Sequence, residues 1–217
     1  MLLSDLEIRE AIKEGNLTIG NFTDSSLQPA SYDLRVGKYV LISGKEKEID
    51  LEKEGSFTIK AGQFALIISY ENIKLSNSLV GHIGMKSYYI RKGLILLAGL
   101  QIDPGWEGSL VLGMYNASPR SITLDYQGSI CTVDFYRLSV PASKGFLSSD
   151  EQKAGLIPKM DKDYLRTLES QTLSEMSESV RHLSENVGRL SNMTYNVLIP
   201  LIIGLYLAIF TAFFLIR

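Results

Sequence analysis

Apolar and polar positions follow three different patterns along the chain, and each pattern predicts a different kind of element. Between Leu34 and Leu138, short apolar or alternating runs are separated by pairs of turn-forming residues, a pattern typical of β-strands. No helix-length period interrupts these runs, so we expect a closed or two-sheet β architecture. The predicted strands are Tyr39–Ile42, Ser56–Ile59, Phe64–Ser69, Leu79–Ile83, Leu94–Leu97, Ser109–Tyr115, Ser121–Leu124 and Ile130–Tyr136.

A short amphipathic helix is predicted ahead of the strands. Ser4, followed three residues later by Glu7, is a capping-box pattern that favours a helix start at this point. The helix is expected to end near Gly15, and its apolar stripe consists of Leu6, Ile8, Ala11 and Ile12.

After Pro141 the strand pattern stops, and a helical heptad pattern replaces it. Residues 143–160 form a mixed polar linker, and a helix is predicted from Asp161. Packing of this helix on its own domain is one interpretation. Parallel self-association as a coiled coil is the other, and we favour it because the heptads continue without a stop into an apolar segment. The seam residues recur at gaps of three and four: Leu173, Met176, Val180, Leu183, Val187, Leu190, Thr194 and Val197.

The apolar segment Val197–Ile216 has twenty residues without a charge, followed by Arg217. At helical rise this covers roughly 30 Å, the thickness of the hydrocarbon core of a bilayer. A buried core helix is the alternative, but the segment is long and apolar on all sides. We therefore predict a transmembrane helix over 197–217, a coiled coil over 161–196 and a β domain over 1–142. Continued seam spacing would place small residues at a helix contact in lipid, along Leu201, Gly204, Ala208 and Thr211.

Composition adds few constraints on function. The formal net charge is −2, so bulk attraction to nucleic acid is not indicated. Cys131 is the single cysteine, which excludes an intrachain disulfide and fits a reducing compartment. With His82 and His182 as the two histidines, no zinc site is expected and no metal ligands are assigned. The simplest topology is a single-pass C-terminal anchor, with the N-terminal domain in the cytoplasm.

Four segments, in order, resemble the dCTP deaminase branch of the dUTPase superfamily. They are Leu27–Arg35 (LQPASYDLR), Lys86–Leu94 (KSYYIRKGL), Ile102–Gly108 (IDPGWEG) and Phe135–Ala142 (FYRLSVPA). The resemblance implies a distorted jelly-roll β-barrel that usually forms a homotrimer. It also implies sites between subunits that bind deoxynucleoside triphosphates, with Mg²⁺ on the phosphates and no zinc. In that chemistry a glutamate handles protons around a water that attacks C4 of cytosine.

The resemblance also assigns roles to particular residues of this chain. Ser87 and Arg91 would hold phosphate, with additional positive charge from Lys86 and Lys92. Asp103 would contact the deoxyribose, although an aspartate here could instead cap the Pro104–Gly105 turn. Tyr88, Tyr89 and Trp106 offer aromatic faces for a base, although packing in the barrel or at a subunit contact is the commoner fate of such residues. The segment 86–92 could equally be a solvated turn.

Four departures from the family pattern concern its catalytic function. The expected glutamate falls on Gly113, which has no carboxylate to polarise water. Tyr88 replaces the second serine of the phosphate segment, and the expected glutamine falls at or near Thr132. The Gly/Tyr-rich C-terminal flap of the family is replaced by the linker and coiled coil. No catalytic residue is therefore assigned.

Three functions remain open from the sequence. The first is a membrane effector: an inactive deaminase-like domain binds a deoxynucleotide or short single-stranded DNA and controls a transmembrane bundle acting as an ion channel or pore. Its layout resembles bacterial antiphage membrane effectors whose ligand is made by a partner nucleotidyltransferase. The second is a membrane-anchored dCTP deaminase or dUTP pyrophosphatase, and the third is an oligomeric scaffold without ligand. The superfamily favours a trimer; valine at a and leucine at d favour a dimer, and a tetramer stays open.

Overall fold

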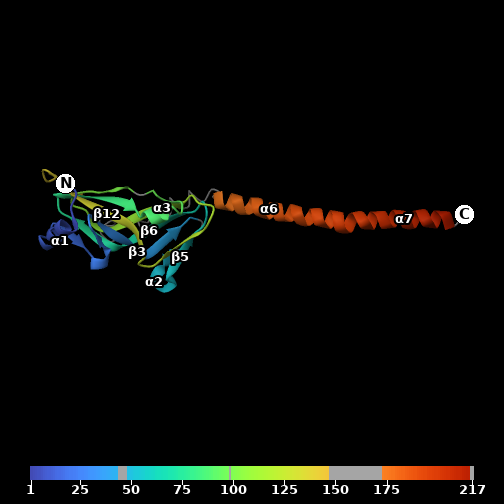
Figure 1. Ribbon diagram of the computed structural model, residues 1–217, viewed down its shortest axis with the longest axis horizontal. Helices are drawn as coiled ribbons and strands as arrows, with labels where there is room; N and C mark the ends of the chain where they lie inside the picture. Colours follow the sequence, from blue (N-terminus) through green and yellow to red (C-terminus); the bar gives the residue numbers. More distant parts are fainter. Residues whose placement is uncertain (44–47, 98, 147–172, 216–217) are drawn as a thin grey trace. The chain divides into compact units, whose positions relative to one another are not determined.

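The computed structural model describes residues 1–43, 48–97, 99–146 and 173–215. These residues divide into two compact units, the first ending at Thr172 and the second beginning at Leu173 (Figure 1). Most of the predicted linker, the predicted helix start at Asp161, and the last two residues, Ile216 and Arg217, lie outside the described residues.

Helix α1 (Asp5–Lys13) begins with the predicted capping box. The Ser4 hydroxyl accepts the Glu7 amide at 3.4 Å, and the Glu7 carboxylate accepts the Ser4 amide at 2.8 Å. These hydrogen bonds hold the pKa of Glu7 below its ordinary value. Ile8 and Ala11 are buried, and the Leu3 amide donates to the Phe135 carbonyl at 2.8 Å, so the helix start is tied to the sheet. The predicted N-terminal helix is confirmed.

The first unit is mainly β, as the sequence predicted (Figure 1). All eight predicted runs fall on strands, and short strands and turns lie between them. One ten-stranded antiparallel sheet has the order β8-β10-β6-β3-β12-β7-β9, with β1 on β6 and β2 and β4 on β3, and β11 pairs with β5 in a second sheet. The strands are β1 (Leu17–Ile19), β2 (Leu27–Gln28), β3 (Ser31–Ile42), β4 (Ile49–Asp50), β5 (Ser56–Ile59), β6 (Phe64–Leu75), β7 (Leu79–Met85), β8 (Leu94–Leu96), β9 (Gln101–Ile102), β10 (Glu107–Asn116), β11 (Ile122–Asp125) and β12 (Ser129–Arg137).

Three short helical turns interrupt the β region, which the sequence pattern did not predict. They are η1 (Asp24–Ser26), α2 (Leu51–Glu54) and α3 (Ser87–Ile90). Strand β3 also begins at Ser31, inside the LQPASYDLR segment, rather than after Leu34. Turns of three or four residues are too short to create a helical period, which explains why they were missed.

The core lies inside the curled sheet. Alternate residues of β10 point inward, so Leu110, Leu112 and Met114 are buried while Val111 and Tyr115 are only partly covered. Cys131 on β12 is fully buried, and this burial raises the pKa of its thiol to about 12. The cysteine is therefore a packing residue.

The second unit is a helix without a break in its path. It consists of α6 (Leu173–Met193), a π-helical turn η2 (Thr194–Leu198) and α7 (Ile199–Leu215) (Figure 1). Its stretch Glu178–Ile209 is long and apolar enough to cross a membrane, and none of it is buried within the chain. Val180, Leu183, Val187 and Leu190 of the predicted seam are each at least 63% exposed. The side chains of Leu173 and Met176 lie outside the described ones.

Candidate functional site

The predicted phosphate segment forms α3 and the turn that follows it. Lys86 precedes the helix in an extended conformation, and Arg91 ends it. Gly93 has a φ of 88°, and a Cβ at this position would lie 2.8 Å from the Ser118 side chain, so only glycine fits the turn. The chain thereby projects Ser87, Tyr88, Arg91 and Lys92 outward, and all four are exposed.

Ser87 and Arg91 have unused polar groups. Neither side chain makes a hydrogen bond or ion pair with any residue that the structure describes. A serine hydroxyl and a guanidinium one helical turn apart are suited to a phosphate oxygen, because the contact is charge-assisted.

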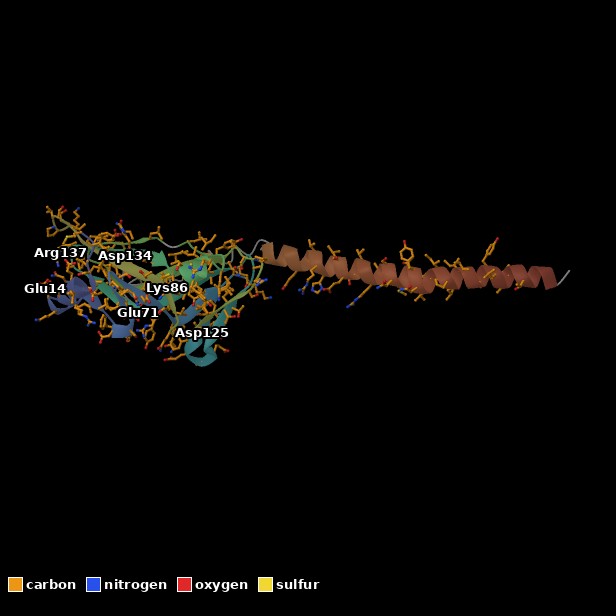
Figure 2. All side chains as sticks on the ribbon, in the orientation of Figure 1. Glu14, Glu71, Lys86, Asp125, Asp134 and Arg137 are labelled. Atoms are coloured by element: carbon orange, nitrogen blue, oxygen red, sulfur yellow. The ribbon has the colours of Figure 1, made fainter. Side chains whose placement is uncertain are left out.

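Lys86, labelled in Figure 2, differs from Ser87 and Arg91, because it is already paired. Its ammonium contacts the Asp33 carboxylate, which is only 5% exposed and also accepts the Gln28 side-chain amide at 3.4 Å. Asp33 on β3 pairs with Thr132 on β12, and Thr132 pairs on its other side with Gly84 of β7, two residues before Lys86. The sequence reasoning gave Asp33 no role, although it lies in the LQPASYDLR segment. In this conformation its charge neutralises one of the predicted phosphate-binding cations.

Tyr88 and Lys92 contact each other. The Lys92 ammonium lies 2.6 Å from the Tyr88 hydroxyl and 4.1 Å from the centre of its ring. Tyr88 also meets Tyr89 edge-on at 5.0 Å, and partial burial raises the pKa of Tyr89. Tyr88 remains 53% exposed, so one face is open to solvent.

Asp103 and Trp106 lie at the two ends of a tight turn. The Trp106 amide donates to the Asp103 carbonyl at 3.1 Å, and Gly105 has the positive φ of 81° that a Pro-Gly type II turn requires. The Asp103 carboxylate accepts the Gln101 side-chain amide at 2.6 Å. Trp106 is partly buried, donates from its indole to the Gly108 carbonyl at 3.2 Å, and packs against Phe146 at 5.1 Å between ring centres.

Strand register separates this turn from α3 within one chain. Ile102 pairs with Gly81, so Asp103 lies beside Val80 near the start of β7, whereas Lys86 follows the end of that strand. Six residues of strand span roughly 20 Å. One chain therefore does not bring Asp103 and the phosphate segment together around a small ligand.

Gly113, at the position of the expected glutamate, lies in the middle of β10. It pairs with Leu66 of β6, and its carbonyl accepts the Leu97 amide at 2.7 Å. A Cβ built at Gly113 would lie 3.0 Å from the Phe64 ring, so the ring already takes much of the space a side chain would need. The acidic residue of the same strand, Glu107, is exposed at its start and pairs with Lys74 at 2.9 Å.

A buried ion pair between β3 and β6 was also missed. Its acidic partner, Glu71, is labelled in Figure 2. Both Glu71 oxygens bond Arg35: one accepts its amide at 2.8 Å and the other its side-chain Nε at 2.6 Å. Glu71 is fully buried, and this burial raises its pKa more than Arg35 lowers it. Arg35 also covers the Tyr70 ring at 4.8 Å and donates to the Asn21 carbonyl at 2.5 Å. These contacts hold β3 to β6 and to the loop at Asn21.

Comparison with known proteins agrees with this arrangement. The profile of the dCTP deaminase-like family matches residues 2–138. The chain belongs to the dCTP deaminase-like family. A dCTP deaminase of Pyrococcus abyssi is 42% identical over 146 residues, covering 67% of this chain and 90% of the relative. A dUMP-forming dCTP deaminase of Aquifex aeolicus is 32% identical over 169 residues, covering 73% of this chain and 93% of the relative.

A solved structure shows the same fold. The 2'-deoxycytidine 5'-triphosphate deaminase of Agrobacterium tumefaciens superposes with a TM-score of 0.53 at 20% identity, covering 64% of this chain and 48% of that one. The first unit therefore has the fold expected of a dCTP deaminase-like domain. The family match ends at Leu138, so the helix that could cross a membrane lies beyond it.

Proposed function

We propose that this protein is a membrane effector whose dCTP deaminase-like domain binds a deoxynucleotide, or a short single-stranded DNA, without deaminating it. One observation carries the proposal: the position of the proton-handling glutamate is Gly113, whereas Ser87 and Arg91 remain exposed and unpaired among the described residues. A site that loses its acid–base group and retains its phosphate contacts is suited to binding, because affinity needs charge and hydrogen bonds but no proton transfer.

The pairing of Lys86 with Asp33 supports a ligand-dependent response. An incoming phosphate competes with Asp33 for the Lys86 ammonium, so binding changes a contact that joins β3 to the end of β7. If Mg²⁺ accompanies a triphosphate ligand, the Asp33 carboxylate would lose its contact with Lys86 and become available to the ion. No protein-held metal is part of the proposal.

Two features of the domain support a homo-oligomer, and the family resemblance favours a trimer. The separation of Asp103 from α3 along β7 means that a complete site needs contributions from two copies. The surface around β8 also carries large apolar side chains in contact with water, which is typical of an interface between subunits. Ile90, Ile95, Leu97 and Leu100 are 56%, 45%, 58% and 57% exposed.

Residues 142–146, which follow the β domain in sequence, dock beside the Asp103–Trp106 turn. The Ala142 amide donates to the Asn77 carbonyl at 2.8 Å, and the Phe146 amide donates to the Pro104 carbonyl at 2.7 Å. Gly145 packs so closely on Gly105 that a Cβ on Gly105 would lie 2.7 Å from it. Because the Asp103–Trp106 turn contacts Gly145 and Phe146, a ligand on Asp103 would act on this segment, which precedes the second unit in the sequence.

The output in this proposal is the helix Leu173–Leu215, packed against other copies and crossing a membrane as a channel or pore. Coiled-coil association through Leu183 and Leu190 would align the copies in parallel. The setting we propose is antiphage defence at a bacterial inner membrane, with the domain in the cytoplasm and the ligand made by an accompanying nucleotidyltransferase. A neighbouring gene for such an enzyme would support this setting.

Binding and catalysis can be separated on the purified full-length chain. Trp106, the single tryptophan, lies in the proposed site and reports binding of dCTP with Mg²⁺ by its fluorescence. We expect a saturable change without formation of dUTP or dUMP. Arg91→Ala removes a charge-assisted contact and should weaken binding about 10- to 100-fold. The matched control is Arg9→Ala, which removes an exposed arginine paired with Asp24. Binding of neither nucleotides nor oligodeoxynucleotides would contradict the proposal and favour a scaffold.

A membrane-anchored enzyme is the second candidate, because a relative named dCTP deaminase is 42% identical to this chain over 146 residues. In that case Asp103 orients the attacking water, with the Gln101 amide holding its carboxylate. Formation of dUTP or dUMP at a steady rate that disappears in Asp103→Ala would establish the enzyme and contradict the effector proposal.

A further inference from the structure

The helix of the second unit contains one irregular turn, where its polar part meets its apolar part. At Thr194–Leu198 the backbone is π-helical, and the Ile199 amide donates to the Thr194 carbonyl, five residues earlier. The Thr194 hydroxyl donates to the Leu190 carbonyl at 2.8 Å, which satisfies its polar hydrogen inside the helix. Single π turns of this kind recur at functional positions in helices.

A π turn changes which side chains share a face. Each residue of an α-helix advances the direction by about 100°, and a π turn accommodates one extra residue in a turn. Side chains that follow it are therefore rotated back by about one residue, or roughly 100°, relative to an unbroken α-helix. The face in line with Leu183, Val187 and Leu190 consequently shifts by one position beyond Leu198.

Counting with this shift changes the predicted membrane face. An unbroken α-helix would continue the seam through Leu201, Gly204, Ala208 and Thr211. With the π turn, the continuation is Ile202, Leu205 and Ile209, at the same gaps of three and four. These side chains are 61%, 60% and 63% exposed, so they are free to meet another helix.

Thr211 provides independent support. Its hydroxyl donates to the Ala208 carbonyl at 3.0 Å within its own helix, so it needs no partner on a neighbouring helix. The face containing Gly204 and Ala208 can therefore contact lipid without leaving a polar hydrogen unsatisfied.

We propose that the π turn selects the membrane contact face: a second copy of this chain packs on Ile202, Leu205 and Ile209 while the turn is present. Conversion of the turn to α-helix rotates the membrane part and presents Gly204, Ala208 and Thr211 instead. The inference rests on the homo-oligomer in the proposed function and specifies how two arrangements of one bundle differ.

The face selection is tested by disulfide cross-linking of variants that each carry one added cysteine. The full-length chain is placed in vesicles of phosphatidylethanolamine and phosphatidylglycerol. Native Cys131 is fully buried and stays silent. Leu183→Cys reports the seam in water, Ile202→Cys and Ile209→Cys report the proposed face, and Gly204→Cys and Ala208→Cys are depth-matched controls. A membrane-permeant oxidant is added, and dimer formation is followed on non-reducing gels.

We expect Ile202→Cys and Ile209→Cys to cross-link at least about fivefold faster than the two controls, because a disulfide needs Cα atoms within about 7 Å. Deleting Tyr195 removes the extra residue, so an unbroken α-helix again places Ile202 and Ile209 in line with Leu183, and the order should be kept. Inserting one alanine after Tyr195 instead brings Gly204 and Ala208 into line and should reverse the order. Suppose that Leu183→Cys cross-links, but Gly204→Cys and Ala208→Cys cross-link as fast as or faster than Ile202→Cys and Ile209→Cys. That result contradicts the face selection but not the oligomer. A reversed order after the deletion, or an unchanged order after the insertion, contradicts the role of the π turn. Absence of a Leu183 cross-link contradicts the oligomer, and the face selection with it.

Discussion

The β domain and the C-terminal helix differ in where their apolar side chains lie. In the domain, residues such as Leu112, Phe135 and Leu17 are completely buried within one chain. In the helix, every described large apolar side chain is at least 38% exposed, from Val180 to Ile209. The domain obtains its hydrophobic stabilisation from its own core, whereas the helix needs lipid or other copies of the chain to cover it. In the proposed function, this difference separates the part that binds a ligand from the part that acts on the membrane.

The largest expected effect breaks the contrast by placing charges on the apolar helix. Each arginine at the centre of a span costs about 2.5–3.5 kcal/mol, so replacing both Leu205 and Ile209 by arginine should release the protein from membranes. Alkaline carbonate extraction measures the released fraction. The matched control replaces Leu183 and Leu190, which belong to the polar part, and should leave the protein in the pellet. Equal release by both pairs would mean that 199–215 does not cross the bilayer.

A second effect concerns the buried ion pair of the domain. Arg35→Ala leaves the Glu71 carboxylate buried without its partner, and we expect a loss of about 3–5 kcal/mol in the free energy of unfolding. Urea denaturation followed by circular dichroism gives this value. Arg9→Ala, which breaks the exposed pair with Asp24, should cost at most about 1 kcal/mol. Similar losses for both variants would show that the Glu71 site is open to water.

A leucine-to-alanine pair compares the two regions directly. Leu112→Ala removes a fully buried side chain from β10 and should lower the free energy of unfolding of the domain by about 2–5 kcal/mol. Leu183→Ala, on the exposed seam, should leave this value within about 0.5 kcal/mol and instead weaken self-association, as measured by sedimentation in detergent. A destabilised domain in Leu183→Ala would show that the helix packs on its own domain.

The smallest effect concerns the start of α1. Ser4→Ala removes the N-cap hydroxyl and should cost about 1 kcal/mol at neutral pH. Because hydrogen bonds from Ser4 hold the pKa of Glu7 below 4.5 in the folded state, their contribution is present above this pH and is lost as the pH falls through and below it. The difference between the variant and the unchanged protein should therefore shrink in acid. A difference that is constant with pH would contradict the capping box.

The elements that repeat a period were predictable from sequence, and isolated contacts were not. Eight strands, the capped helix α1 and the heptad helix follow from periodic positions that local sequence controls. The turn α3 was too short to predict, and the Lys86–Asp33 and Arg35–Glu71 pairs join residues 53 and 36 positions apart. Nothing in the local pattern of either segment indicates such a partner.

The candidate site was only partly predictable for the same reason. The segments that match the family located Ser87, Arg91, Asp103 and Gly113. They did not show that Asp103 lies at the opposite end of β7 from α3. Heptad spacing and the uncharged apolar run likewise located α6 and α7 but not the π turn at Thr194–Leu198, because a one-residue change in phase depends on backbone hydrogen bonding.

The proposed coupling of ligand binding to the membrane is tested most directly by dye efflux from vesicles containing the full-length protein. The four deoxynucleoside triphosphates with Mg²⁺ and short oligodeoxynucleotides are added one at a time. The account predicts that at least one of them changes the efflux rate, and that Arg91→Ala abolishes this change while Arg9→Ala preserves it. Efflux that is absent, or unaffected by every ligand, would contradict the account.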